Sequence, residues 1–185
     1  MASEKPLTAV ACAAFDEATD AEILAVREAV RGLGVKVADS PAHRPHITLT
    51  AARVTQADLP RFADALAELA AGMPVLPIRL NEVGVFMRSG VLWLGPERDK
   101  ALTDMQREIY KALKRAGWPS PFAETAPFRW TAHCTLATRV PRQLLRDTRE
   151  SLLDQTTVIE GRIAAVATIL VGGRGDVAHA PLRQS

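Results

Sequence analysis

The sequence predicts a mixed fold of helices and strands that is built from two related halves. The pattern His-x-Thr-Leu occurs twice, at residues 46–49 and 133–136, each time inside an apolar run that favours a strand. Helix-like and strand-like segments follow one another in the same order around both copies. His46 and His133 are 87 residues apart in the sequence. Gly34 and Gly117, the residues expected to end a helix in each half, are 83 residues apart. Because only two copies occur, the repeat indicates duplication within one domain rather than a solenoid.

The first half is expected to span about residues 7–87. Thr19 and Glu22 form a capping-box pattern at the start of a helix, and an apolar stripe continues that helix to the stop at Gly34. Pro60 is compatible with the first turn of a second helix. In order, the expected elements are a strand at 7–15, a helix from Thr19 to about 33, a turn-rich stretch at 39–41, the motif strand at 45–52, a helix at 56–71 and a strand at 75–86 with a bend at Pro77.

The second half, about residues 91–171, repeats this order. We therefore expect residues 1–171 to form a single domain of two lobes, followed by a C-terminal tail at 172–185. The expected elements are a strand at 91–94, a helix at 99–116, a proline-containing loop, the motif strand at about 128–138, a helix that begins at Pro141 and a strand at 163–171.

The composition is typical of a globular protein. The 185 residues, 48% hydrophobic and 24% charged, suit one domain or two small lobes that share a core. A net charge of +2 argues against a protein that coats long duplexes but allows a local basic groove for a small anion or an RNA end. No apolar stretch reaches membrane-spanning length, and the start shows no signal-peptide pattern. Cys12 and Cys134 form no disulfide framework, so buried free thiols and a reducing cytoplasm are expected.

The repeated motif places a histidine and a threonine on the same face of a strand. Side chains alternate along a strand, so His46 and Thr48 point one way while their apolar neighbours anchor the other face in a core. His133 and Thr135 are expected to be arranged in the same way. Cys134, which lies between them in the sequence, should therefore be buried rather than act as a nucleophile.

Two histidines on opposite sides of a reacting atom can supply a general base and a general acid near neutral pH. The two threonine hydroxyls could hold the non-bridging oxygens of one phosphate. This array suits the cleavage or formation of a phosphodiester without a metal, since fixed donors stabilise the charge that builds on the phosphorus oxygens. Two halves packed about a pseudo-twofold axis would bring the motif strands face to face, with His46 and His133 across one groove.

These motifs resemble a known family. Arg44-Pro45-His46-Ile47-Thr48-Leu49, with His133-Cys134-Thr135-Leu136, is similar to the two-histidine (2H) phosphoesterase superfamily and to its bacterial 2′-5′ RNA ligase / RNA 2′,3′-cyclic phosphodiesterase branch. The resemblance covers roughly residues 7–171, although Ala132 replaces the proline that many members have before the second histidine. It implies an α+β, bilobal fold with antiparallel sheets lining a central groove. It also implies that His46 and His133 are the acid–base pair and that Thr48 and Thr135 hold the phosphate.

We therefore expect a cyclic phosphodiesterase that hydrolyses the 2′,3′-cyclic phosphate of nucleotides or RNA ends, as a monomer and without a cofactor or metal. His133 is favoured as the base and His46 as the acid. The alternatives are 2′-5′ RNA ligation or 2′-5′ linkage cleavage by the same residues, and an RNA- or nucleotide-binding module without turnover. A zinc site of His43, His46 and His133 is disfavoured, because Pro45 breaks helical spacing and no carboxylate or cysteine cluster completes the ligand set.

Further residues are candidates for substrate binding. Arg44 and Arg129 are in phase with the motif histidines and could clamp a phosphate, whereas the alternative is a solvated surface role. Aromatic rings could stack a base at the rim of the groove, with core packing as the alternative. The aromatic candidates are Phe15, which is preferred, and Trp130, Phe86 and Phe128.

Overall fold

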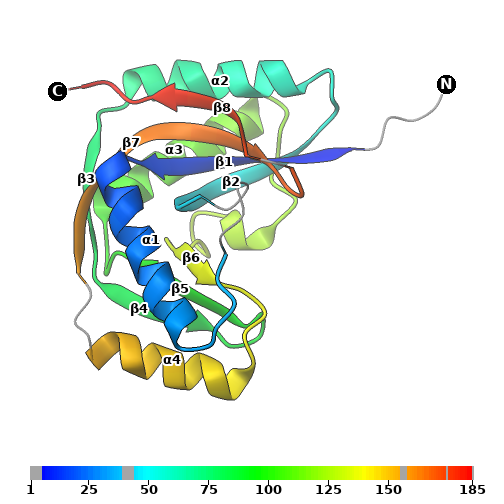
Figure 1. The fold of residues 1–185 in the computed structure, drawn as a ribbon. Coiled ribbons are helices and arrows are strands. Elements are labelled where there is room, and N and C mark those ends of the chain that lie inside the picture. The colour runs from blue at the N-terminus through cyan, green and yellow to red at the C-terminus, as the bar shows by residue number, and fades with distance from the viewer. Residues whose placement is uncertain (1–5, 39–43, 155–157, 174, 185) are drawn as a thin grey trace.

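A computed structural model describes residues 6–38, 44–154, 158–173 and 175–184. The expected order of strand, helix, motif strand, helix and strand occurs in both halves, and each half ends in one additional strand (Figure 1). The first half contains β1 (Leu7–Phe15), α1 (Glu17–Gly32), β2 (His46–Val54), α2 (Leu59–Gly72), β3 (Leu76–Leu80) and β4 (Glu82–Phe86). The second half contains β5 (Val91–Gly95), α3 (Lys100–Arg115), the 3-10 helix η2 (Ala123–Thr125), β6 (Cys134–Ala137), α4 (Arg142–Asp154), β7 (Ile159–Leu170) and β8 (Asp176–Pro181).

Four details differ from the sequence prediction. The second motif strand, expected at about 128–138, is only β6 (Cys134–Ala137), because the backbone N–H groups of Arg129 and Trp130 donate to the carbonyl of Ala126 in a turn; His133 therefore lies directly before the strand. The strand expected at 75–86 is divided at Asn81, because β3 pairs with β7 whereas β4 pairs with β5. The expected C-terminal tail contains β8. Its sequence, which includes two alanines and a proline, predicts a strand only weakly, and pairing with β7 stabilises it. The cap of the first helix is Asp16, three residues before the predicted cap Thr19, and its carboxylate accepts a hydrogen bond from the backbone N–H of Thr19. The turn-rich stretch expected at 39–41 lies outside the described residues.

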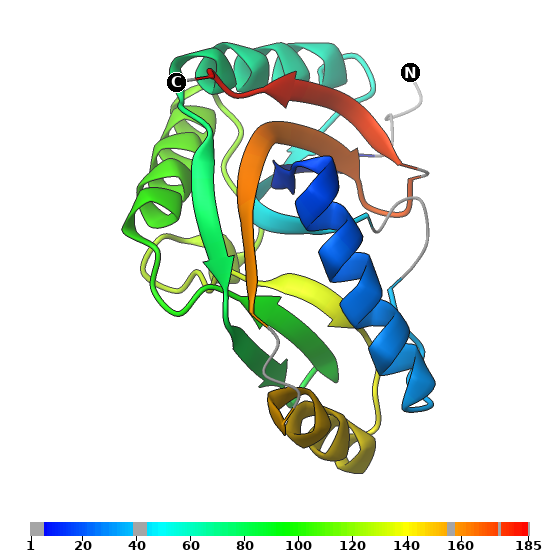
Figure 2. The same cartoon turned by 60° about the vertical axis from the view of Figure 1, so that its left-hand side comes forward.

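The strands form one curled antiparallel sheet in the order β3-β7-β1-β2-β6-β5-β4, and β8 pairs with β7. The two motif strands, β2 and β6, are therefore neighbours at the centre of this order. Figure 2 shows β7 bending along its length, which lets one strand contact both β1 and β3. Helix α2 packs on β7 and β8, whereas α4 packs on β4 and β5 at the other end of the molecule (Figure 1). This arrangement confirms the predicted α+β class with helices flanking antiparallel strands.

Most buried apolar side chains belong to one core that receives residues from both halves. The strand β1 is buried on both faces: Ala9, Ala11 and Ala13 lie in this main core, while Cys12 and Ala14 lie in a second, smaller apolar cluster. Burial on both faces explains why the sequence of β1 is apolar throughout instead of alternating. None of the helices in the part of the chain that the structure describes combines the length and apolar character needed to cross a bilayer.

Candidate active site

The two motifs lie side by side in the sheet. The middle residue of the first, Ile47, is the antiparallel register partner of Cys134, the middle residue of the second. Extending that register by one residue in each direction puts His46 opposite Thr135, and Thr48 opposite His133. In an antiparallel pair, opposite Cβ atoms are about 5 Å apart and diagonal neighbours about 7–8 Å. The four side chains therefore mark the corners of a square on one face, with the histidines on one diagonal and the threonines on the other.

This arrangement differs from the expected one in a specific way. The sequence predicted motif strands that face each other across a groove, whereas β2 and β6 are hydrogen-bonded neighbours. The alternation within each motif is confirmed. Ile47, Leu49, Cys134 and Leu136 are all 0% exposed, whereas the histidine and threonine of each motif are partly exposed. Burial raises the pKa of the Cys134 thiol to about 11, so this cysteine remains a protonated core residue at neutral pH.

The backbone orients both imidazole rings in the same way. Nδ1 of His46 lies 2.7 Å from the carbonyl oxygen of Arg44, and Nδ1 of His133 lies 2.8 Å from the carbonyl oxygen of Thr131. A carbonyl oxygen can only accept a hydrogen bond, so Nδ1 carries the proton in each ring. In the neutral form, Nε2 of each ring is therefore left with its lone pair, and in the charged form it holds a proton that it can donate.

The surroundings of His133 are aromatic. Its ring meets that of Phe86 edge to face with centroids 4.9 Å apart, and the centroid of Trp93 is 6.3 Å away. Burial lowers the pKa of His133 below 6.5, although the hydrogen bond to Thr131 opposes this shift. A neutral imidazole at pH 7 is suited to accept a proton, so this environment favours His133 as a base.

Arg44, the residue whose carbonyl orients His46, forms two ion pairs through its side chain. The guanidinium of Arg44 lies 2.8 Å from the carboxylate of Asp20 on α1 and 3.2 Å from that of Asp176 on β8. Burial raises the pKa of Asp20, and the Arg44 guanidinium opposes that shift. Arg44 therefore lies beside the first motif, as its sequence position suggests, but its charge is already shared between two carboxylates. Its role in binding a phosphate stays a prediction.

Each motif threonine is also held through its backbone carbonyl. The indole Nε1–H of Trp130 donates to the carbonyl of Thr48 at 2.8 Å, and Nη2 of Arg27 donates to the carbonyl of Thr135 at 2.8 Å. The donors are exchanged between the halves: Trp130 belongs to the second half and supports the first motif, whereas Arg27 belongs to α1 and supports the second motif. We call these two hydrogen bonds the crossed supports.

Sequence reasoning did not identify Arg27. Its side chain is only 2% exposed, and it lies on α1 between the buried residues Ile23, Val26 and Val30. An arginine on the apolar stripe of a helix was the available signal, since a buried guanidinium needs partners. Trp130 is a candidate for stacking a base, with core packing as the alternative. Its indole N–H donates to β2 and its ring packs partly against the main core, and a role in base binding stays a prediction.

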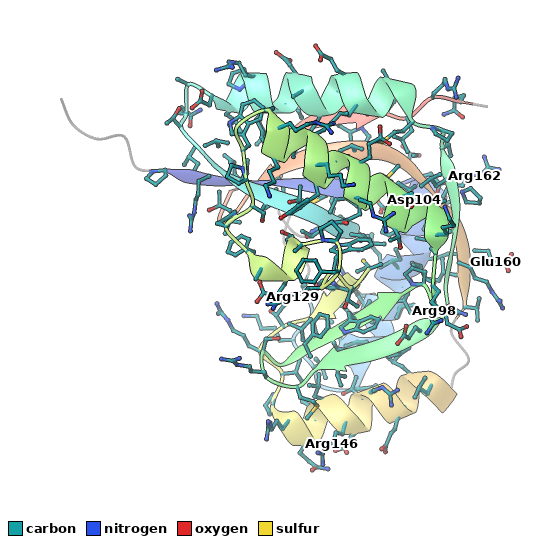
Figure 3. The ribbon with its side chains drawn as sticks, turned by 180° about the vertical axis from the view of Figure 1, so that it is seen from behind. Arg98, Asp104, Arg129, Arg146, Glu160 and Arg162 are labelled. Carbon is teal, nitrogen blue, oxygen red and sulfur yellow. The ribbon has the colours of Figure 1, made fainter. Side chains whose placement is uncertain are left out.

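The remaining substrate-binding candidates occupy different places. Phe15 is 2% exposed and lies in the main core, because the strand that carries it is covered on both faces; the structure therefore does not place this ring where a base could stack. Phe86 lies at the site, against His133. Arg129 lies on the connection between α3 and β6 (Figure 3), where its guanidinium is 5.6 Å from the ring of Phe128, which is 84% exposed.

Among the described residues, no group of three histidine, cysteine or acidic side chains is placed to hold a metal ion. His43, which belonged to the alternative zinc site, lies outside the described residues, so the structure does not address that alternative.

Comparison with known proteins places this arrangement in context. A family model described as the 2′-5′ RNA ligase superfamily matches residues 15–174. Among solved structures, LigT of E. coli in its apo form is similar over 98% of this chain and 96% of its own, with a TM-score of 0.60 and 19% identity. The protein TT0787 of Thermus thermophilus is similar over 96% of this chain and 99% of its own, with a TM-score of 0.58 and 18% identity.

The PDE domain of MHV ns2 has the same fold as well. It matches over 91% of this chain and 100% of its own, with a TM-score of 0.57 and 16% identity. No curated protein matches the chain in sequence. At these identities the likeness to solved structures establishes a shared fold, and the family model supplies the relationship in sequence.

Proposed function

Because the chain belongs to the 2′-5′ RNA ligase superfamily of 2H phosphoesterases, we propose that it hydrolyses the 2′,3′-cyclic phosphate of nucleotides or RNA ends by two-histidine acid–base catalysis. The observation that carries this proposal is the square formed by the two motifs. It offers two imidazoles on one diagonal and two hydroxyls on the other, all on one partly exposed face of the sheet. A cyclic phosphate placed over its centre would have a proton acceptor on one side and a proton donor on the other.

The proposed reaction assigns a different task to each histidine. Neutral His133 accepts a proton at Nε2 from a water molecule, and the water oxygen forms a bond to phosphorus. The bond from phosphorus to one ribose oxygen breaks, and that oxygen receives the proton that His46 carries at Nε2. The ring opens to a phosphomonoester, and the two histidines end with exchanged protonation states. The lowered pKa of His133 supports its assignment as the base.

The threonines are proposed to stabilise the charge of the transition state. The hydroxyls of Thr48 and Thr135 would donate to the two non-bridging oxygens, and donors fixed in advance cost no reorganisation at the moment of reaction. LigT, which shares the fold, has been solved with phosphate and with 3′-AMP, which supports a phosphate-bearing nucleotide as the ligand of such a site. One copy of the chain contains both motifs, so a monomer is sufficient for the complete site, and its two buried free thiols suit a reducing cytoplasm.

The decisive experiment is incubation of the protein with 2′,3′-cyclic nucleotides, alone and at the end of oligoribonucleotides, with product analysis by chromatography. We expect a nucleoside monophosphate, and we expect EDTA to leave the rate unchanged because side chains supply the acid, the base and the phosphate donors. The position of the phosphate in the product, 2′ or 3′, identifies the ribose oxygen that His46 protonates. Tight binding of these compounds without product would contradict the proposal and favour a non-catalytic binding module.

The same residues could also join RNA ends. If a 5′-hydroxyl took the place of water, its oxygen would bond to phosphorus and give its proton to His133. The bond from phosphorus to the 3′ oxygen would break, that oxygen would take the proton of His46, and a 2′-5′ linkage would remain, as the family name suggests. Incubating RNA with a cyclic phosphate end and RNA with a 5′-hydroxyl end separates the two reactions. We expect hydrolysis to exceed ligation, because water is present at far higher concentration than a second RNA end.

A further inference from the structure

Leu49, the last residue of the first motif, is a β-bulge. Its neighbours Thr48 and Thr50 pair with consecutive residues of β1, so β2 has one residue more than its partner at this point. Leu49 lies in the main core, and the next residue of β2 in that core is Ala52, three positions later instead of two. Under strict alternation, Ala52 would share a face with His46 and Thr48. The bulge therefore lets β2 bury its C-terminal half while the polar side chains of the motif face away from the core.

Leu136 repeats this feature in the second motif. Its neighbours Thr135 and Ala137 pair with consecutive residues of β5, so β6 also has one extra residue. Leu136 and Ala137 both lie in the main core although they are adjacent in the sequence, as expected at a bulge. Bulges are frequent beside active sites, where they redirect a side chain. In this protein both bulges come directly after the threonines that are proposed to hold the phosphate.

The carbonyl of each bulged leucine accepts a hydrogen bond from a residue outside the strands of the sheet. The side-chain Nε2 of Gln106 donates to the carbonyl of Leu49 at 3.0 Å, and the backbone N–H of Ala38 donates to the carbonyl of Leu136 at 3.0 Å. A bulge disrupts the regular ladder locally, so its backbone groups need such partners. The donors are exchanged between the halves as in the crossed supports, since Gln106 belongs to the second half and Ala38 to the first.

Gln106 lies on α3, the helix that contacts β2 and carries the labelled Asp104 in Figure 3. Its side chain is 0% exposed, and Nε2 also donates to the carbonyl of Thr125 in η2 at 2.8 Å, so both protons of the amide are used. Its Oε1 has no partner among the described residues, a cost that a methionine of similar length would avoid. The two N–H donors are therefore what a glutamine supplies at this position.

We propose that Gln106 is a positioning residue for the phosphodiesterase reaction: by holding the carbonyl of Leu49 it fixes the bulge, and the bulge fixes the direction of the Thr48 hydroxyl towards the phosphate. Gln106 acts through the backbone of β2 and not on the substrate itself. Its effect concerns one of the two non-bridging oxygens, because the bulge of the second motif is held separately by Ala38. This inference rests on the proposed function for its main readout.

The experiment uses the two diastereomers of a nucleoside 2′,3′-cyclic phosphorothioate, each of which has sulfur in place of one non-bridging oxygen. Sulfur is a weak hydrogen-bond acceptor, so one diastereomer loses the bond from Thr48 and the other loses the bond from Thr135. Gln106→Met keeps the approximate length of the side chain and removes both donors. It should lower kcat/KM roughly fivefold for the diastereomer that still offers oxygen to Thr48 and leave the other nearly unchanged. Thr48→Val identifies that diastereomer, because this variant should lower the same rate selectively.

The matched control is Ile109→Val, three residues further along α3. Ile109 is 0% exposed, and the change removes one buried methyl group without touching a hydrogen bond to either motif. It lowers stability but should keep the wild-type ratio between the diastereomers. Gln106→Leu, which also lacks a donor, is a second variant in case the methionine packs badly, and it should shift the ratio in the same direction as Gln106→Met. An unchanged ratio in these variants, or an equal fall for both diastereomers, overturns the inference.

Failure of the proposed function would give a different result. If the wild-type protein hydrolyses neither diastereomer nor the parent cyclic phosphate, the proposed function fails. The role of Gln106 is then judged by titration with inorganic phosphate, which Gln106→Met should bind roughly fivefold more weakly than Ile109→Val. Equal affinities, or no binding by the wild-type protein, would overturn the inference as well.

Discussion

Neighbouring strands place very different side chains beside the two motif threonines. Cys12 of β1 is the register partner of Thr48, whereas Trp93 of β5 is the register partner of Thr135. The thiol of Cys12 is buried and hydrogen-bonded to the Thr48 side chain, within a cluster of small apolar residues. On the other side, an indole fills the corresponding position and reaches the second histidine.

The histidines differ in the same sense. A carbonyl two residues earlier orients each ring. The ring of His133 is surrounded by aromatic rings. The carbonyl that orients His46 belongs to Arg44, whose guanidinium is paired with two carboxylates. The duplicated backbone thus provides equal geometry, and the side chains of neighbouring strands and helices provide unequal environments. This difference is what a pair of identical groups needs if one is to serve as base and the other as acid.

Removing either histidine should have the largest effect. We expect His46→Ala and His133→Ala each to lower kcat for a 2′,3′-cyclic nucleotide by roughly 10²–10⁴-fold. An activated phosphodiester with a 4-nitrophenolate leaving group sharpens the comparison, because this group departs without protonation. The His46 variant should then recover much of its activity, and the His133 variant should not. Steady-state kinetics with both substrates measure this, with His179→Ala on β8 as the control.

Equal losses on both substrates would contradict the unequal roles of the two histidines. Full activity of the His46→Ala variant on the cyclic nucleotide would remove the mechanism itself.

Breaking one of the crossed supports should have an intermediate effect. Trp130→Phe removes the N–H that the Thr48 carbonyl accepts while keeping a ring in place. A hydrogen bond of this kind contributes about 1 kcal/mol, so we expect kcat to fall roughly fivefold with little change in KM. Trp118→Phe, whose ring packs on Phe62, is the matched control. A fall confined to thermal stability, with kcat unchanged, would show that this support does not position Thr48.

The smallest effect should be a shift in pH dependence. Burial holds the pKa of His133 below 6.5, so the base form persists as the pH falls and activity should decline only below about pH 6.5. Phe86→Ala opens the aromatic wall to water and should raise the pKa towards 6.5. The acidic limb of the kcat/KM profile should therefore move to higher pH in this variant. A limb that stays in place would show that Phe86 does not contribute to the burial of His133.

The local part of the site could be predicted from the sequence because it depends on the period of a strand. Alternation alone puts His46 and Thr48 on one face and Ile47 in the core, and the structure confirms it. The pairing of β2 with β6 could not be predicted, because strand order depends on contacts between segments far apart in the sequence. A twofold axis between the halves is compatible with two motif strands that face each other across a groove. It is equally compatible with two motif strands that are antiparallel neighbours in one sheet, which is the observed arrangement.

Other features depend on burial that the sequence does not show. Phe15 ends a strand before a helix, which suggests an exposed rim, yet both faces of β1 are covered. Arg27 donates to the carbonyl of Thr135, a partner 108 residues away that is known only once the chain is folded. Four of the six residues of β8 are Asp, Ala or Pro, which are depleted in strands, so pairing with β7 rather than its own propensity determines its structure.

The crossed supports also limit how this protein can be re-engineered. A half transplanted into another scaffold would lose the donor that its own threonine relies on, since that donor is encoded in the half left behind. A working chimera would have to carry α1 together with the second motif, and the connection from α3 to β6 together with the first. The unit of exchange is therefore a motif and its distant partner, not a contiguous piece of chain.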